Sequence, residues 1–292
     1  MIALTGVAGG ARRTRLPRAA DRLPLGKSGL KVSPICLGMT SSPETVVAAY
    51  ESGVNFFFVT GDLHWPLYDP LRRGLATLLQ GSPSRRQEIV VAIVSYLDNP
   101  LFSALQFHEV IAEVPGLEYV DLIIAGAVSS PESFYSRLDS IARARAGGHL
   151  GARAIGATFH QRTLALVADH YDLLDIGYIR YNSAHPGART DLFPFFSGRR
   201  SSLVFNFKSV MSRVTREMFD ALRVPASYWL PSPVDYYRFV LSRPEIDGIL
   251  CSPMLPEEVK ELASALERPP LTGDEEEYMV RMSSAVHTAV LT

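Results

Sequence analysis

The sequence of 292 residues has few cysteines, almost no net charge and no long apolar run, and each shortage excludes a class of protein. Its two cysteines, Cys36 and Cys251, are too few and too far apart for a disulfide framework or a zinc site, which favours a reducing cytoplasm. Its 29 basic and 30 acidic residues leave a formal charge of −1, so no global field attracts nucleic acid or an anionic membrane. No apolar run approaches the roughly 20 residues that span a bilayer. We expect a soluble, cytoplasmic protein that binds neither nucleic acid nor membrane.

The chain does contain ample apolar material, because 47% of its residues are hydrophobic and 20% are charged. Single α/β barrels commonly have about this length, so we expect one domain over residues 22–292. Near the N-terminus the charged residues follow a stretch of small residues instead of preceding an apolar segment, unlike a secretory signal. We expect residues 1–21 to form a flexible tail.

After this tail, strand-like and helix-like segments alternate. The stretch LPLGKSGLKVSP predicts a hairpin that turns at Lys27, Ser28 and Gly29. Eight apolar runs follow, each continuous in hydrophobicity as in strands covered on both faces: PICLGM, VNFFFVT, EIVVAIVSY, YVDLIIAGA, ARAIGATF, LLDIGYIRY, SLVFNFKS and IDGILCS.

Helix-like segments lie between the runs, and several begin with proline and an acid, as in Ser42-Pro43-Glu44. The pattern predicts an α/β fold, a (β/α)8 TIM barrel with an N-terminal β-hairpin. A doubly wound sheet is the alternative, but no G-x-G-x-x-G follows a first strand.

In such a barrel, functional side chains lie where the strands end. The residues at the predicted strand ends should therefore meet at one mouth. They are Met39, Thr40, Asp62, His64, Ser95, Tyr96, Gly126, Thr158, His160, Arg180, Tyr181, Asn182, Lys208, Ser209 and Ser252.

Several segments resemble those of aldo-keto reductases, in the same order. LGKSGLKVSPICLGM is similar to the opening hairpin and first strand of that family, and AAYESGVNFFFVTGD to its A-x-x-x-G-I-N-F-F-D-T-A-D. YVDLIIAG is similar to Y-I-D-L-x-x-x-H, GARAIGATFH to G-K-I-R-x-I-G-V-S-x-H, and DIGYIRYN to D-x-x-Q-x-x-Y-N. RYNSAHPGARTDLFPFF resembles a motif of a divergent bacterial group. The resemblance spans residues 23–266 and implies a barrel that reduces carbonyls with NADP or NAD.

The four catalytic residues of that family, an Asp, a Tyr, a Lys and a His, do not carry over. In their order, the matching positions hold Phe58 or Val59, His64, Val94 or Ser95, and Gly126. In the family, the Lys and the Asp lower the pKa of the Tyr so that it donates a proton near neutral pH. Histidine as a residue type already exchanges protons in that range. We predict Asp62 and His64 as a rebuilt acid–base pair; alternatively, Asp62 caps the next turn and His64 packs on the surface.

The resemblance also implies binding residues at the mouth. Those predicted to bind a nicotinamide cofactor are Thr158, His160, Tyr178, Lys208 and Ser252. Those predicted to bind the substrate are Tyr96, Arg180, Asn182 and His185. We expect no metal ligands.

Three of these assignments have alternatives. His160 aligns with the polar residue that meets the nicotinamide carboxamide, but a loop histidine can also be simply solvated. Tyr178 replaces a glutamine and could stack under a nicotinamide or pack within the barrel wall. Lys208 could face a phosphate, a substrate carboxylate or solvent.

The last strand–helix turn argues against a dinucleotide. Met254, Leu255 and Leu262 stand where the family places a basic residue for the 2′-phosphate and an Asn for adenine.

We therefore expect an aldo-keto reductase-like enzyme with a rebuilt active site, acting on a small molecule of specialised metabolism. Its reaction would be NADP- or NAD-dependent reduction of a carbonyl or imine, or a related oxidation. The alternatives are a non-redox isomerase, dehydratase or cyclase, and a non-catalytic binding subunit. The oligomeric state does not follow from the sequence.

Overall fold

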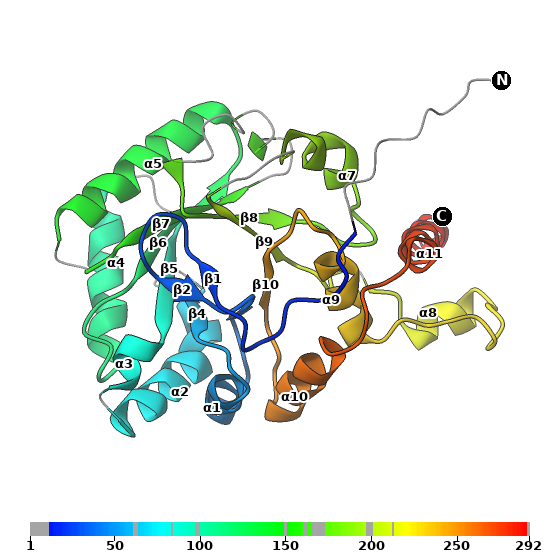
Figure 1. Ribbon diagram of the computed structural model, residues 1–292, viewed down its shortest axis with the longest axis horizontal. Coiled ribbons are helices and arrows are strands. Elements are labelled where there is room, and N and C mark those ends of the chain that lie inside the picture. Colours follow the sequence, from blue (N-terminus) through cyan, green and yellow to red (C-terminus); the bar gives the residue numbers. More distant parts are fainter. Residues whose placement is uncertain are drawn as a thin grey trace.

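The computed structural model describes residues 12–60, 64–82, 84–96, 100–148, 151–159, 163–164, 167, 173–196, 201–211 and 213–290. Within them, eight parallel strands close into a barrel in the order β10-β3-β4-β5-β6-β7-β8-β9, with helices around it (Figure 1). The strands are β3 (Ile35–Leu37), β4 (Phe56–Thr60), β5 (Val90–Ser95), β6 (Leu122–Val128), β7 (Ala154–Phe159), β8 (Ile176–Arg180), β9 (Leu203–Phe207) and β10 (Gly248–Cys251). The predicted (β/α)8 barrel is confirmed.

The predicted hairpin is also present and closes one end of the barrel. Strand β1 (Leu23–Pro24) pairs antiparallel with β2 (Lys31–Val32). Leu25 and Val32 are fully buried in the same cluster as residues at the starts of the barrel strands. Gly26 has φ +51°, and a β-carbon there would lie 2.2 Å from Asp175 Oδ1, so glycine is required. The hairpin covers the amino-terminal end and leaves the carboxyl-terminal end for a site.

The continuous hydrophobicity of the strands is explained by two separate cores. Along β4, Phe56 and Phe58 belong to the cluster inside the barrel, whereas Phe57 and Val59 belong to the cluster under the helices. This is the side-chain alternation of a strand buried on both faces. Each face therefore needs apolar residues, and no polar residue interrupts the run.

Helices cover the outside of the barrel, and the helix predicted after Ser42 begins at Pro43. Among the described residues the α-helices are α1 (Pro43–Glu51), α2 (Asp69–Gln80), α3 (Arg85–Glu88), α4 (Pro100–Glu113), α5 (Pro131–Ala146), α7 (Ala188–Asp191), α8 (Arg216–Ala221), α9 (Pro233–Leu241), α10 (Pro256–Ala265) and α11 (Gly273–Val290). Two 3₁₀ helices are η1 (Trp65–Tyr68) and η3 (Phe193–Phe196). Proline lies in the first turn of α1, α5 and α10, as expected from its fixed φ.

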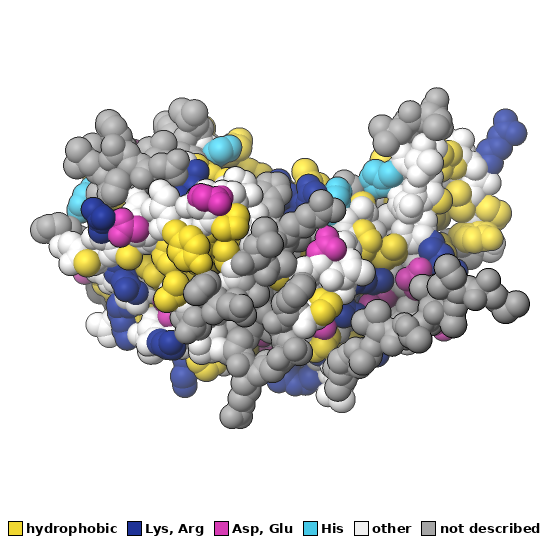
Figure 2. All heavy atoms as spheres, turned by 90° about the horizontal axis from the view of Figure 1, so that it is seen from above, with side chains coloured by type: hydrophobic (Ala, Val, Ile, Leu, Met, Phe, Trp, Pro, Cys, Tyr) yellow, Lys and Arg dark blue, Asp and Glu magenta, His cyan; other side chains and the backbone are white. Residues whose placement is uncertain are grey.

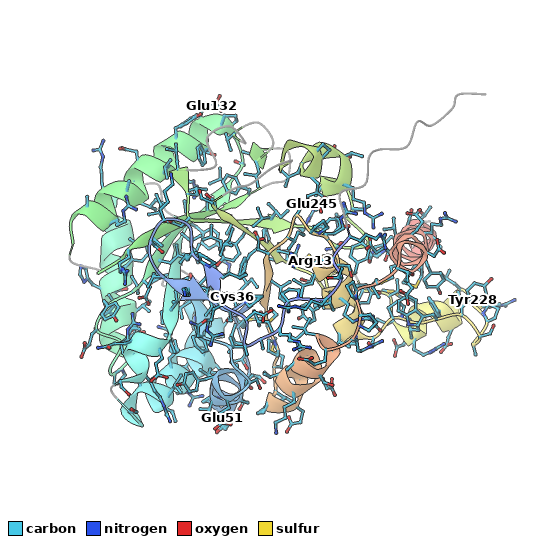
Figure 3. The ribbon with its side chains drawn as sticks, in the orientation of Figure 1. Arg13, Cys36, Glu51, Glu132, Tyr228 and Glu245 are labelled. Atoms are coloured by element: carbon cyan, nitrogen blue, oxygen red, sulfur yellow. The ribbon has the colours of Figure 1, made fainter. Side chains whose placement is uncertain are left out.

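The segment before the hairpin packs against the barrel. Arg13 donates hydrogen bonds to the carbonyls of Ile246, at 2.6 Å, and Arg243, at 3.3 Å (Figure 3). Leu16 is 1% exposed within the core under the helices. The expectation of a flexible tail is therefore corrected for residues 12–21, while residues 1–11 lie outside the described part. No helix among the described residues combines the length and the apolar character that crossing a membrane requires.

Candidate functional site

His64 and Tyr96 lie together at the carboxyl-terminal end of the barrel. Tyr96 follows β5, and His64 follows β4 at the start of η1. Their ring centroids are 5.8 Å apart and the ring planes make an angle of 55°. Tyr96 is 39% exposed and His64 is also exposed, so both side chains can reach solvent and a ligand.

The position of Tyr96 depends on a glycine in the next strand. A β-carbon at Gly126 would lie 2.3 Å from Cδ1 of Tyr96 and 2.5 Å from Cε1. Arg137 on α5 donates hydrogen bonds to the carbonyl of Gly126 and, at 3.3 Å, to that of Tyr96. The ring of Tyr96 thus occupies the space beside Gly126, the residue that the resemblance aligns with the family's His.

The predicted partner of His64, Asp62, lies outside the described residues. The structure thus leaves the Asp62–His64 pair a prediction and brings His64 together with Tyr96, which the sequence assigned to substrate binding. This pairing was missed because it joins the ends of two different strands. The only sequence signal was the glycine at the position of the family's His.

The two residues that align with the family's catalytic Asp, Phe58 or Val59, are both buried, Phe58 inside the barrel and Val59 under the helices. Phe58 is 3% exposed, and its ring centroid lies 5.8 Å from that of Tyr178 and 6.4 Å from that of Tyr68. Tyr178 also packs on Phe205, with centroids 5.9 Å apart. These aromatic rings fill the barrel beneath the mouth, and neither Phe58 nor Val59 supplies a carboxylate.

Tyr178 is therefore part of the barrel interior. It has no exposed surface and lies in the interior cluster with Cys36. Burial, and after it the interaction with Cys251, raise the pKa of the Cys36 thiol, which keeps the thiol protonated. Of the two roles considered for Tyr178, packing within the wall is the one that this geometry supports, because neither face of its ring is open to a nicotinamide.

Thr158 acts on the end of a neighbouring strand. Its Oγ1 accepts a hydrogen bond of 2.6 Å from the backbone N–H of Ala127, which has φ +54°. Thr158 is 8% exposed. Its hydrogen bond stabilises the left-handed backbone of Ala127, the residue that follows Gly126. Ser252 is exposed at the end of β10, and His160 lies outside the described residues.

The ends of β8 and β9 bring together Arg180, Asn182, His185 and Lys208. Asn182 is 1% exposed; its Nδ2 donates to the Lys208 carbonyl at 2.9 Å, and its Oδ1 accepts from the backbone N–H of His185 at 2.9 Å. The side chain of Asn182, predicted to bind substrate, is thus used to shape the loop. Burial, then the charge of Arg180 and then that of His287, lower the pKa of His185 below 6.5.

The turn after β10 does not fit the phosphate of a dinucleotide. The backbone N–H of Met254 donates to the carboxylate of Glu258 at 2.6 Å, so an acid of the chain itself occupies this end of α10. The Met254 carbonyl accepts side-chain hydrogen bonds from Thr40, Ser41 and Thr45. The resemblance places the cofactor phosphate in this region. A phosphate bound at this turn would lie beside the Glu258 carboxylate, and the turn itself supplies no basic residue to offset that repulsion.

Within the described residues, no group of three or more His, Cys, Asp or Glu side chains is arranged to hold a metal ion. On the face drawn in Figure 2, acidic and basic side chains are interspersed, so this face carries no extended patch of one sign.

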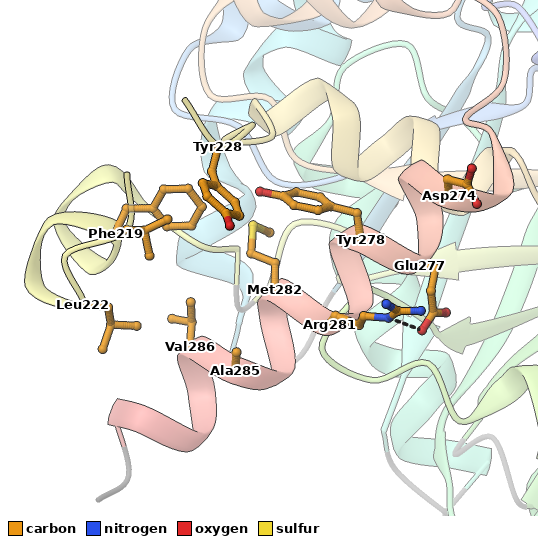
Figure 4. A pocket seen from close by; sticks show the side chains of 11 residues that line it. Phe219, Leu222, Tyr228, Asp274, Glu277, Tyr278, Arg281, Met282, Ala285 and Val286 are labelled. Atoms are coloured by element: carbon orange, nitrogen blue, oxygen red, sulfur yellow. Dashed lines mark hydrogen bonds and ion pairs between the residues drawn. The ribbon is translucent and has the colours of Figure 1, made fainter. Parts of the chain in front are cut away.

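A separate apolar groove lies away from the mouth. It has a volume of about 550 Å³ and runs between α11 and the segment that contains α8 (Figure 4). Phe219, Tyr228, Tyr278 and Met282 line it, and Tyr228 lies at the outer edge of the molecule in Figure 3. Among the described residues, the lining of this groove contains no histidine, so we place the chemistry at the mouth, where His64 lies.

A scan against protein-family models found no match, and neither did a search of curated proteins. Solved structures do match. The aldo-keto reductase AKR11C1 from Bacillus halodurans, in its holo form, has a TM-score of 0.65 at 13% identity, over 93% of this chain and 96% of that one. PA4992 from Pseudomonas aeruginosa, which is assigned to the aldo-keto reductases, has a TM-score of 0.63 at 15% identity, over 87% and 97%. The chain therefore has the aldo-keto reductase fold.

Proposed function

We propose that the chain is an enzyme that moves a proton to or from a small molecule at the mouth of an aldo-keto reductase barrel, without hydride transfer. His64 is the acid–base group, and the hydroxyl of Tyr96 is a second donor beside it. The single observation that supports the proposal is the contact between His64 and Tyr96 beside Gly126, because it brings two proton-exchanging groups together at the mouth. In the resemblance, His64 aligns with the family's Tyr and Gly126 with its His.

Two further observations separate this reaction from the usual one of the fold. The two residues that align with the family's Asp, Phe58 or Val59, are both buried and apolar, so neither supplies the charge that would tune a catalytic tyrosine. The Glu258 carboxylate occupies the turn where a cofactor phosphate would bind. We therefore derive no step through a nicotinamide.

The test is hydrogen exchange with solvent. The protein is incubated in D₂O with a panel of enolisable small carbonyl compounds, including 2-oxo acids, and deuterium incorporation is followed by NMR. We expect at least one compound to exchange without any added cofactor. His64→Gln should lower the rate by about 10²-fold or more, since general acid–base catalysis contributes 10²–10⁴. His108→Gln, an exposed histidine on α4, is the matched control and should retain the rate.

If no compound exchanges above the buffer rate, or if His64→Gln and His108→Gln behave alike, the proposal fails.

The second candidate is NADP- or NAD-dependent reduction, which is favoured by the likeness of the fold to an aldo-keto reductase in its holo form. It predicts saturable binding of NADPH or NADH and no solvent exchange without a cofactor.

A further inference from the structure

Two cationic residues lie at the adjacent ends of β8 and β9. Arg180 ends β8 and pairs in register with Phe207, the residue before Lys208. Because side chains alternate along a strand, Arg180 points to the same side as Tyr178, into the barrel. The Lys208 ammonium lies 5.7 Å from the ring centroid of Phe207, which packs on the interior cluster. Arg180 is therefore on the inner face of β8, and the Lys208 ammonium lies near a ring that packs on the interior cluster.

Buried asparagines hold the backbone around both cations. Asn206 has no exposed surface, and its Nδ2 donates to the carbonyls of Ile179, at 3.1 Å, and Tyr181, at 2.7 Å, which flank Arg180. Likewise, Asn182, which follows β8, donates a hydrogen bond to the carbonyl of Lys208, which follows the neighbouring strand β9. Two side-chain amides thus fix the positions from which the cations project.

Lys208 adopts a costly backbone conformation. Its φ of +62° lies in the left-handed region, which favours glycine over residues with a β-carbon. Such residues persist where the surrounding structure holds them, and they are frequent at functional sites. Glycine would therefore fit the backbone at residue 208, so a Lys208→Gly variant removes the ammonium group without straining the chain.

Two cations at neighbouring strand ends suit an anion. Arg180 and Lys208 are both cationic, and the predicted acid Asp62, two residues after β4 in the sequence, lies outside the described residues. Lys208 is one of only four lysines in the chain and the one that ends a strand. An arginine fork beside a lysine can bind an oxyanion through charge-assisted hydrogen bonds.

We propose that Arg180 and Lys208 bind an oxyanion of the substrate, a carboxylate or a phosphate, with Asn182 and Asn206 as positioning residues. This inference rests on the proposed function, since it names the substrate class of the same mouth. The substrate is then an anionic small molecule whose charged group lies at β8 and β9 and whose reacting carbon faces His64.

The test uses inorganic phosphate and succinate separately, as probes of the two sources, in calorimetric titrations of the full chain at constant ionic strength. We expect saturable binding of at least one probe, and the tighter one identifies the source. Lys208→Gly should weaken binding by about tenfold or more, because a charge-assisted contact is lost. The same variant should keep or raise the urea midpoint, because glycine suits the backbone there.

Arg223→Gly is the matched control. Arg223 is an exposed cation with φ +53° next to α8, so this substitution removes the same charge at the same kind of backbone position, away from the mouth. We expect its affinity for the probe to equal that of the wild type. Equal loss in Lys208→Gly and Arg223→Gly, or no binding of either probe by the wild type, overturns the inference.

His64→Gln separates this inference from the proposed function. If the anion site is correct, this variant binds the probe as the wild type does, whatever happens to solvent exchange. Anion binding without any exchange would refute the proposed function alone, and exchange without anion binding would refute the inference alone.

Discussion

Tyr96 and Gly126 are complementary across two strands, since the tyrosine ring occupies the space that any β-carbon at residue 126 would need. His64 lies beside the tyrosine ring. Arg137 donates hydrogen bonds to the backbone carbonyls of Tyr96 and Gly126. The position of Tyr96 in the site therefore depends on the absence of a side chain at residue 126.

A double-mutant cycle tests this complementarity. Gly126→Ala should destabilise the wild type by about 1 kcal/mol, because the ring must move out of its place. In a Tyr96→Ala background the same substitution should cost much less, so the coupling energy should be at least about 0.5 kcal/mol. Urea unfolding of the four proteins gives the result. Additive costs would show that the ring does not depend on Gly126.

The carboxylate of Glu276 anchors α11 to the rest of the chain. Its side chain is 5% exposed, and it lies 3.4 Å from Arg189, 3.9 Å from Arg243 and 3.6 Å from Arg12. Glu276→Ala should lower the free energy of unfolding by about 3 kcal/mol, because a buried group is removed from its partners. In Glu277→Ala, which removes the exposed neighbour, the loss should stay below about 1 kcal/mol. Equal losses in urea unfolding would contradict this assignment.

His185 gives the stability a defined dependence on pH. Its pKa in the folded chain lies below 6.5, because burial, Arg180 and His287 all disfavour its charged form. The unfolded chain therefore binds a proton here at a higher pH than the folded one, so the free energy of unfolding falls as the pH drops through 6.5. Urea unfolding at a series of pH values should show this slope, and His185→Gln should reduce it. An NMR titration that places the pKa of His185 above 6.5 would refute the prediction.

The sequence predicted the barrel and its hairpin because both rest on local patterns. A run such as FFFVT fits a strand buried on two faces, and a glycine-containing turn fits a hairpin, whichever partners the strands find. The strand-end residues could be named for the same reason. Their order along the chain and the barrel geometry are enough to place them at one mouth.

What the sequence could not predict depends on contacts between distant segments. The packing of Tyr96 over Gly126 requires the register of β5 on β6, which a single sequence does not contain. Arg13 binds carbonyls more than 200 residues away, so a segment without apolar periodicity still packs against the barrel. The roles of Asn182 and Asn206 were hidden likewise, because a buried amide is recognised by its partners.

We propose that this barrel transfers a proton without a nicotinamide. The most direct test is to titrate the wild-type protein with NADPH and NADH up to millimolar concentration, and to follow binding by nucleotide fluorescence and calorimetry. A holo aldo-keto reductase measured alongside serves as the positive control. We predict no saturable binding of either nucleotide to this chain, because Glu258 occupies the turn after β10 and Tyr178 is buried. Saturable binding that is weakened by substituting Thr158 or Ser252 at the mouth would contradict the claim.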